Sequence, residues 1–329
     1  MKHWIEAARL RTLPLSVSGI IVGSMYALAH PTEGELTPTQ VFSWKIFGFA
    51  LLTTLGFQIL SNFANDYGDG VKGTDNEDRI GPKRAIQSGV ISPQAMKRAI
   101  AITSILTLMS AITLIYLAFR ATNLGYSLFF LVLGIMAIAS AIRYTVGKSA
   151  YGYSGFGDVF VFVFFGLVST LGVNFLYSKE FDWLLVLPAV AIGFLSVGVL
   201  NLNNMRDEES DKKSNKNTIV VKIGGAAAKK YHYFLIVSAM VLVLIFAILF
   251  DYDKDVNPYG FNFDLYLFVL AYIPLIKHLI RVSKNKNPRD LDPELKKLAI
   301  STFLLAILLS VSMIYLFSDI FVNLFLGGR

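Results

Sequence analysis

Nine long apolar stretches constrain the fold of this chain more than any other feature of its sequence. A helix that crosses a lipid bilayer needs roughly 20 mostly apolar residues, and stretches of about that length recur along all 329 residues. Only 16% of the residues are charged, whereas soluble domains carry about a quarter. The sequence therefore predicts an all-α, polytopic membrane protein. The nine expected spans are residues 13–29, 44–64, 100–119, 126–142, 158–177, 183–202, 233–250, 265–280 and 298–317.

The first apolar stretch shares features with a cleaved signal peptide, because basic residues precede it and an Ala-Leu-Ala sequence ends it. However, residues 13–29 fill a membrane span and exceed the usual apolar core of a signal peptide. We therefore expect this stretch to be retained as the first transmembrane helix.

Lys and Arg are distributed unequally between the two sides of the predicted membrane topology. With nine spans, 24 of the 30 Lys and Arg residues fall on the side of the N-terminus and of the loops after spans 2, 4, 6 and 8. Cytoplasmic loops carry the excess of basic residues, so we expect a multi-pass protein of the inner (cytoplasmic) membrane with these loops in the cytoplasm. The split also explains the net charge of +7 without a nucleic-acid partner, because no basic stripe interleaved with aromatic residues lies in a soluble region.

Two acidic segments follow the second and the sixth predicted span, on the predicted cytoplasmic side. In each segment three polar residues recur at helical spacing, i, i+4, i+7 in the first and i, i+4, i+8 in the second. Each set lies on one helical face if the helix continues that far. Polar side chains that continue a transmembrane helix are functional by default. The two sets are Asn62, Asp66 and Asp69, and Asn203, Asp207 and Asp211.

Clustered carboxylates repel one another unless a cation holds them together. Mg²⁺ prefers oxygen ligands and is usually held by one or two carboxylates plus substrate phosphates. Zinc is disfavoured, because the chain has no cysteine and its four histidines lie away from both segments. We expect each segment to hold Mg²⁺ against a shared diphosphate, where the metal stabilises charge on the departing group. The expected catalytic and metal-binding residues are Asp66, Asp69, Asp207 and Asp211, with Asp75 as a further metal ligand and Asn62 and Asn203 as substrate contacts.

Basic residues near the acidic segments suit the remaining oxygens of a diphosphate, since arginine can pair with phosphate bidentately. The basic segment 281–297 is expected to be a solvated loop. The expected diphosphate contacts are Lys72, Arg79 and Arg84, with Lys83, Lys212 and Lys216 as further candidates.

These motifs resemble those of the UbiA superfamily of intramembrane aromatic prenyltransferases. The likeness covers roughly residues 5–320 and implies nine transmembrane helices around a central cavity, with acidic motifs after helices 2 and 6. Where many members carry a further aspartate, this chain has Gly73. Asp75 then binds the metal through water or shapes the loop. The segments that carry the likeness are residues 58–75, 78–82, 87–91, 144–147, 151–158, 163–166 and 201–207 with Asp211.

The resemblance is greatest to the branch that uses 1,4-dihydroxy-2-naphthoate, and it implies the reaction. A polyprenyl diphosphate ionises, the naphthoate ring attacks the allylic cation, and the carboxylate leaves as CO₂, giving demethylmenaquinone and diphosphate. The implied partners are these two substrates, Mg²⁺ and the lipid bilayer. The sequence does not indicate any protein partner. We expect one transmembrane domain over residues 1–329, with pseudo-repeat halves at about 1–125 and 126–250 and C-terminal helices at 251–329.

The predicted loop after the fourth span is the expected site for the aromatic acid. Arg143 or Lys148 is expected to bind the carboxylate of the acid, and the rings of Tyr144 and Tyr151 to shield the allylic cation by cation–π attraction. Asp158 begins the fifth span, where it either belongs to the site or stabilises the helix N-terminus. An aromatic belt at the membrane interface is an equally good reading of the tyrosines.

Three alternatives accompany this reading. A CDP-alcohol phosphatidyltransferase shares the Asp-x-x-Asp-Gly pattern of residues 66–70, but the rest of its motif is absent. A membrane transporter usually places charges near the bilayer midplane, whereas these acidic segments lie at span ends. A sister prenyltransferase for 4-hydroxybenzoate or homogentisate shares both acidic motifs, and residues 73–75 and 78–82 argue against it.

Overall fold

The computed structural model describes residues 2–29, 42–75, 80–120, 122–147, 149–252 and 263–325. Within these ranges the chain is helical and contains no strand, which confirms the all-α prediction. The longer helices are α2 (Leu13–Ala29), α4 (Trp44–Lys72), α5 (Pro93–Phe119), α6 (Leu124–Arg143), α9 (Val186–Arg206), α12 (Gly225–Tyr252), α13 (Tyr272–Lys284) and α14 (Asp292–Phe325). The shorter ones are α1 (Lys2–Ala8), η1 (Leu10–Thr12), η2 (Tyr151–Ser154), α7 (Gly157–Val161), η3 (Phe162–Gly172), α8 (Val173–Ser178), α10 (Glu208–Lys213), α11 (Ile219–Ile223), η4 (Phe263–Ala271) and η5 (Pro288–Leu291).

Eight helical segments of the described chain are long and apolar enough to cross a membrane, counting α7, η3 and α8 as one span. A ninth span results if α1 and α2, which meet at a bend of 53°, count together. The nine predicted spans therefore each coincide with a helix. The predicted division into two pseudo-repeat halves and C-terminal helices stays a prediction.

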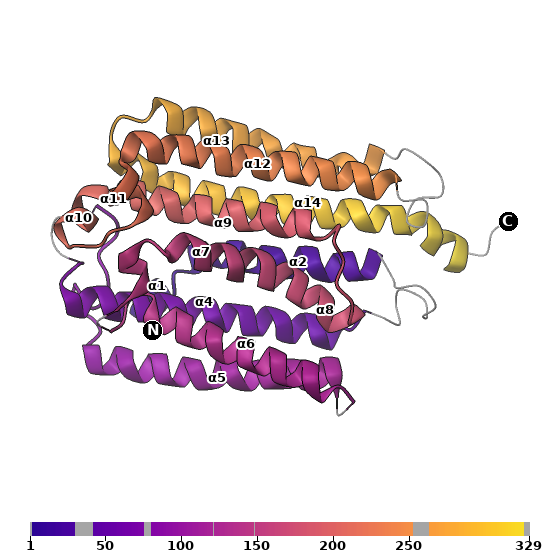
Figure 1. Ribbon diagram of the computed structural model, residues 1–329, viewed down its shortest axis with the longest axis horizontal. Helices are drawn as coiled ribbons and strands as arrows, with labels where there is room; N and C mark the ends of the chain where they lie inside the picture. Colours follow the sequence, from indigo (N-terminus) through magenta and orange to yellow (C-terminus); the bar gives the residue numbers. More distant parts are fainter. Residues whose placement is uncertain are drawn as a thin grey trace.

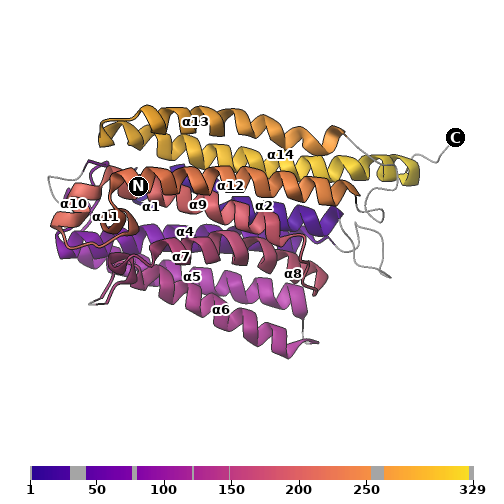
Figure 2. The ribbon, with the colours of Figure 1, turned by 45° about the horizontal axis from the view of Figure 1, so that its top comes forward.

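The long helices lie side by side with their axes in roughly one direction (Figure 1; Figure 2). In Figure 1, α12, α13 and α14 lie on one side and α4, α5 and α6 on the other, with α2, α7, α8 and α9 between them. The short helices α10 and α11 lie at one end of the bundle, and α14 ends at the opposite end (Figure 1). Both α4 and α9 run toward the end that carries α10, so both acidic motifs reach the same end.

The outer and inner helices differ as expected for a protein in lipid. Helix α6 has no buried residue, and it exposes large apolar side chains such as Phe129, Val132 and Met136. Helix α9 is mostly buried at the centre of the bundle. Its close approach to η3 depends on glycine, because a Cβ added to Gly166 would lie 2.6 Å from the Cα of Gly193. Small residues allow such close packing between membrane helices.

The span that contains η3 departs from the regular helix that its sequence predicts. Over the 11 residues of η3 the backbone is π-helical. Such segments are rare and frequently lie at functional sites. In this protein η3 forms one wall of the cavity described below.

Candidate active site

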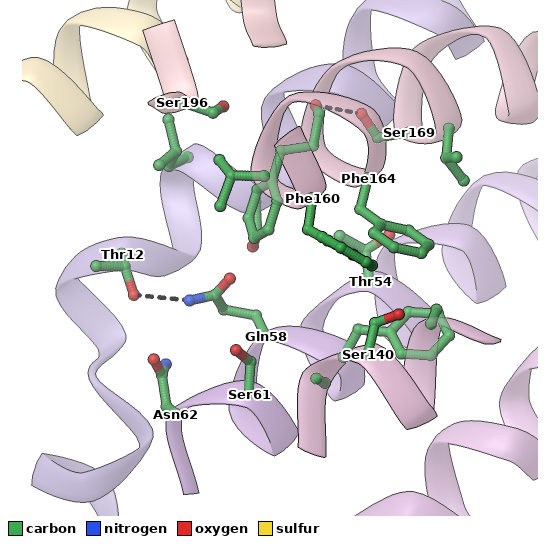
Figure 3. Close-up of a pocket in the computed structure, with 18 of the residues that line it drawn as sticks. Thr12, Thr54, Gln58, Ser61, Asn62, Ser140, Phe160, Phe164, Ser169 and Ser196 are labelled. Atoms are coloured by element: carbon green, nitrogen blue, oxygen red, sulfur yellow. Dashed lines mark hydrogen bonds between the residues drawn. The ribbon is translucent and has the colours of Figure 1, made fainter. Parts of the chain in front are cut away.

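A cavity of about 350 Å³ lies between the helices of the bundle. Its mostly apolar walls come from α2, α4, α5, α6, η3 and α9. Figure 3 shows Gln58 of α4 facing Thr12 on one side, with Phe160 and Phe164 forming an aromatic wall nearby. A size of a few hundred Å³ and an apolar lining with a few polar groups are typical of small-molecule sites. This cavity therefore suits a long apolar ligand with one polar end.

A smaller polar chamber of about 20 Å³ adjoins the cavity, since Asp69, Arg84, Asn203 and Lys216 line both spaces. The two acidic motifs, which are far apart in the sequence, thus meet around one chamber. Its other lining residues are Thr74, Asp75, Asp207, Ser210 and Asp211.

Asp66 anchors the segment that follows the first motif. Its Oδ2 and Oδ1 atoms accept hydrogen bonds from the backbone N–H groups of Ala85 (3.2 Å) and Ile86 (3.3 Å). The neighbouring Arg84 is thereby held at the chamber, where its Nε lies 3.8 Å from Oδ2 of Asp75. Asp66 therefore lies next to the chamber without lining it. Its predicted role as a metal ligand stays a prediction.

Asp69 is oriented by the loop after α6. The hydroxyl of Tyr153 donates a hydrogen bond to Oδ1 of Asp69 at 2.7 Å, and the hydroxyl of Thr74 lies 2.6 Å from the same tyrosine oxygen. Because the single proton of Tyr153 goes to Asp69, Thr74 must be the donor in the second bond. Burial and the Asp69 carboxylate both raise the pKa of Tyr153, which keeps it a neutral donor. The ammonium of Lys72 lies 4.0 Å from the centre of the Tyr153 ring.

The second motif is organised by Arg206, whose side chain is almost fully buried (1% exposed). Its Nε and Nη2 atoms donate to the two carboxylate oxygens of Asp207 at 2.8 and 2.6 Å, and Nη2 also donates to Oδ1 of Asn203 at 2.9 Å. Its Nη1 atom donates to Asp292 at the start of α14. Because α9 ends at Arg206, Asp211 lies on the separate helix α10. The predicted single helical face therefore holds for Asn203 and Asp207 alone.

Lys216 joins the two motifs. Its ammonium lies 3.8 Å from Oδ2 of Asp69 and 3.5 Å from Oδ1 of Asp211, and the residue is buried. Burial alone would lower the pKa of Lys216, but the carboxylates of Asp69 and Asp211 raise it, so it stays charged. Burial raises the pKa of Asp211 to about 6, while Lys216 acts in the opposite direction. The chamber thus contains a charged lysine between two buried carboxyl groups.

The carboxylates of the chamber fit a magnesium ion that is shared with a ligand. Among the described residues, no three acidic or histidine side chains converge closely enough to hold a metal by themselves. Mg²⁺ commonly binds one or two carboxylates and completes its octahedron with water and phosphate oxygens. Oδ2 of Asp211 is buried and accepts no hydrogen bond from any described residue. A metal ligand position would satisfy this oxygen, since buried polar atoms seldom stay unpaired.

Three aromatic rings in mutual contact line the cavity beside the chamber. Tyr151 stacks on Phe160 with ring centres 4.0 Å apart, and Tyr144 meets Tyr151 edge-on at 5.4 Å. The hydroxyl of Tyr151 donates to the carbonyl oxygen of Ser140 at 2.9 Å, which fixes the ring. Burial raises the pKa of Tyr144 to about 12, so the ring stays neutral. Such rings attract a cation through their π faces.

The structure does not bring every predicted residue to the cavity. Arg143 is exposed at the end of α6 and does not line the cavity. Asp158 lies buried in the first turn of α7, where it accepts a hydrogen bond from Tyr231 at 3.2 Å, and it lines neither space. Arg79 and Lys148 lie outside the described residues.

The bend between α1 and α2 is a part of the site that the sequence analysis missed. Nδ2 of Asn62 donates to the carbonyl oxygen of Ala8 at 2.8 Å, and Nε2 of Gln58 donates to Oγ1 of Thr12 at 3.1 Å. Arg9 lies between these contacts in the left-handed region (φ 52°) and lines the cavity. Gln58 could have indicated this part of the site from the sequence, because it is a polar residue in an apolar span, one helical turn before Asn62.

Comparison with known proteins decides the family. Residues 35–307 match the model of the UbiA prenyltransferase family. The chain belongs to this family. Over 314 residues it is 40% identical to the Haemophilus influenzae protein named 1,4-dihydroxy-2-naphthoate octaprenyltransferase. The aligned residues cover 95% of this chain and 96% of that protein. An Escherichia coli protein of the same name is 40% identical over 294 residues, covering 89% of each chain.

This UbiA family member also shares its fold with a solved structure. A UbiA homolog from Archaeoglobus fulgidus bound to GPP and Mg²⁺ superposes with a TM-score of 0.64, covering 96% of this chain and 99% of that chain. At 14% sequence identity the likeness concerns the fold alone. The family and the fold that the sequence motifs resemble are thus confirmed.

Proposed function

We propose that this protein is a magnesium-dependent 1,4-dihydroxy-2-naphthoate polyprenyltransferase of menaquinone biosynthesis. The C–O bond of a polyprenyl diphosphate breaks, a C–C bond forms to the naphthoate ring, and CO₂ and diphosphate leave. Because no oxidant takes part, both ring hydroxyl groups remain and the product is demethylmenaquinol, the reduced form of demethylmenaquinone. The observation that carries the proposal is the 40% identity to dihydroxynaphthoate octaprenyltransferases over most of the chain. The apolar cavity that ends in an acidic chamber supports it.

Asp69, Asp207 and Asp211 line the chamber and would hold magnesium there, with Asp75 beside them and Asp66 fixing the adjoining segment. Bound Mg²⁺ would neutralise the diphosphate as it departs. Lys216 and Arg84 line the same chamber and Lys72 lies beside it, so these cations are suited to the phosphate oxygens. Asn203, which lines both spaces, would contact the diphosphate where it joins the prenyl chain.

The aromatic wall of the cavity would then act on the allylic cation. The stacked rings of Tyr151 and Phe160, with Tyr144 beside them, line the space next to the chamber. Aromatic rings stabilise a nearby positive charge, and an apolar wall would exclude the water that otherwise captures the cation. The naphthoate ring must enter beside this wall to attack the same carbon.

The membrane setting follows from the charge distribution. The 24 basic residues on one predicted side support a position of the acidic chamber at the cytoplasmic face of the inner membrane. Mg²⁺ and the naphthoate are soluble on that side, while the prenyl chain reaches the cavity from the bilayer.

The test is a transfer assay on membranes that contain the protein. Dihydroxynaphthoate, 4-hydroxybenzoate and homogentisate are each offered with prenyl diphosphates of several chain lengths, with and without Mg²⁺. We expect prenylation of dihydroxynaphthoate alone, with release of CO₂, and only when Mg²⁺ is present. Prenylation of another acceptor in its place would overturn the proposed substrate, and uptake without diphosphate release would indicate a transporter.

A further inference from the structure

The bend between α1 and α2 is fixed to α4 by two side-chain amides one helical turn apart. Asn62 holds the carbonyl oxygen of Ala8 before the bend, and Gln58 holds the hydroxyl of Thr12 after it. Between these contacts Arg9 adopts a φ of 52°, which residues other than glycine seldom adopt. Its carbonyl oxygen accepts hydrogen bonds from both the backbone N–H (3.0 Å) and the hydroxyl (2.9 Å) of Thr12. The backbone of Arg9 is therefore held in one strained conformation beside the cavity.

The amide of Gln58 has a fixed orientation that leaves its oxygen available to a ligand. The single hydroxyl proton of Thr12 goes to the carbonyl oxygen of Arg9, so this hydroxyl can only accept from Nε2 of Gln58. Oε1 of Gln58 is then buried and accepts no hydrogen bond from any described residue. Gln58 is 9% exposed and lines the cavity together with Thr12 (Figure 3). Since buried polar atoms seldom stay unpaired, this oxygen suits a hydroxyl group of a molecule in the cavity.

The cations around the cavity divide between its two polar regions. The described basic residues that line it are Arg9, Arg84, Lys216 and Lys296. Arg84 and Lys216 also line the acidic chamber, where the anionic diphosphate is expected, and Lys296 is exposed. Arg9 is half-buried at the bend. A guanidinium carries five N–H donors, so Arg9 can bind a carboxylate while it makes other contacts.

We propose that the bend between α1 and α2 is the subsite for the aromatic acid, where Arg9 pairs with the carboxylate and Oε1 of Gln58 accepts a hydrogen bond from a ring hydroxyl. An anion that enters a mostly apolar cavity needs a paired cation, and Arg143, the cation expected for this role, is exposed. The inference rests on the proposed function, because it concerns the acceptor of the same reaction.

The depth of the bend fits this role. Asn62 and Gln58 precede Asp69 by 7 and 11 residues on α4, which corresponds to roughly 10 and 16 Å along the helix axis. This depth leaves room for the first prenyl carbon between the chamber and the acid. It also keeps the carboxylate away from the departing diphosphate, which is itself an anion.

Three compounds that differ by one kind of group test the two contacts separately. They are 1,4-dihydroxy-2-naphthoate, 2-naphthoate, which lacks the hydroxyl groups, and 1,4-dihydroxynaphthalene, which lacks the carboxylate. Their binding to the purified, full-length protein in detergent is measured by equilibrium dialysis without oxygen. We expect Gln58→Met to weaken binding of the two hydroxyl compounds about tenfold and to leave 2-naphthoate unchanged. Arg9→Met should weaken binding of the two carboxylates at least about tenfold and leave 1,4-dihydroxynaphthalene unchanged, and Arg9→Lys should recover part of the loss.

Matched controls undergo the same exchanges at exposed positions. Gln94 lies near the start of α5, and Arg120, which also has a positive φ (51°), follows the end of that helix. Gln94→Met and Arg120→Met should bind all three compounds as the wild type does. Binding of Mn²⁺ with inorganic diphosphate should stay at the wild-type level in every variant, because the chamber is intact.

A variant at Gln58 or Arg9 that weakens all three compounds alike, or that also loses binding of Mn²⁺ with diphosphate, would give the bend a purely structural role and overturn the proposal. Unchanged binding of all three compounds in both Gln58→Met and Arg9→Met would overturn it as well. Failure of the wild type to prenylate dihydroxynaphthoate would instead overturn the proposed function, and the binding pattern is read independently of that outcome.

Discussion

Replacing Lys216 by methionine removes the only charge that links the two acidic motifs directly across the described chamber, and it keeps most of the side-chain volume. The ammonium lies 3.8 Å from Asp69 and 3.5 Å from Asp211, and Lys216 is 8% exposed. In Lys216→Met, two buried carboxyl groups therefore face each other without this cation.

The size of the effect follows from the burial of these groups. Removing one partner of a buried ion pair costs about 3–5 kcal/mol, because the other charge stays buried. Burial already raises the pKa of Asp211 to about 6 with Lys216 present, and loss of this nearby positive charge raises the pKa further. Asp211 then binds a proton near neutral pH, which limits the expected loss of stability at pH 7.5 to about 2–3 kcal/mol.

The pH dependence has a defined sign. A carboxyl group whose pKa is raised on folding destabilises the folded protein when it ionises, so stability is highest below its unfolded pKa and falls as pH rises through its folded pKa. The loss of thermal stability in Lys216→Met should therefore be larger at pH 7.5 than at pH 5.5. Mg²⁺ with inorganic diphosphate should restore more stability in this variant than in the wild type, because the metal replaces the missing charge.

The assay is thermal unfolding of the purified protein in detergent at both pH values, with and without Mg²⁺ and diphosphate. Lys212→Met is the matched control, since Lys212 is exposed on α10 and undergoes the same exchange. A Tm that equals that of the control at both pH values, or that falls without any response to pH or Mg²⁺, would refute this account of Lys216.

Three further outcomes are expected. Tyr153→Phe removes the hydrogen bond to the Asp69 carboxylate. Since hydrogen bonds to charged groups are worth about 1.5–3 kcal/mol, kcat should fall at least about tenfold while the KM for dihydroxynaphthoate is unchanged. An unchanged kcat contradicts the role of Tyr153. The transfer rate of the wild type at limiting Mg²⁺ should fall as pH decreases through about 6, because Asp211 becomes protonated; a rate that stays constant from pH 7 to 5 argues against Asp211 as a ligand. Gly166→Ala should lower the Tm by several degrees because its Cβ meets the backbone of α9, whereas Gly48→Ala, which meets nothing within 4 Å, should leave it unchanged.

The sequence predicted the parts of this structure that depend on local patterns. Apolar length placed every span, and helical spacing placed Asn62, Asp66 and Asp69 on one face of α4. That helix continues to Lys72, which the spacing required. The cavity beside the chamber also contains Tyr144 and Tyr151, two of the residues predicted for the aromatic side.

These local patterns could not predict contacts between segments that are distant in the sequence. The hydrogen bond from Tyr153 to Asp69 depends on how the loop after α6 folds over the end of α4, and no spacing within either segment reports it. The same holds for Asp292, which meets Arg206 through the packing of α14 against α9. Arg143 was predicted from its charge and its place beside the tyrosines, but the last turn of the lipid-facing helix α6 directs it outward.

The π-helical backbone of η3 could not be predicted from the hydropathy of its residues. Its residues, from Phe162 to Gly172, are mostly apolar, like those of a regular transmembrane helix. Gly166 in this stretch packs closely against Gly193 of α9, and the stretch lines the cavity. Hydropathy alone reports neither contact.

The central claim is that the two acidic motifs form one metal–diphosphate site. It is tested most directly by diphosphate-dependent Mn²⁺ binding to Asp69→Asn and Asp211→Asn, measured together with prenyl transfer to dihydroxynaphthoate. These residues come from different motifs and lie on either side of Lys216. We predict that each variant alone loses most of both the Mn²⁺ binding and the transfer activity. Normal Mn²⁺ binding and near-normal transfer in either variant would contradict a shared site.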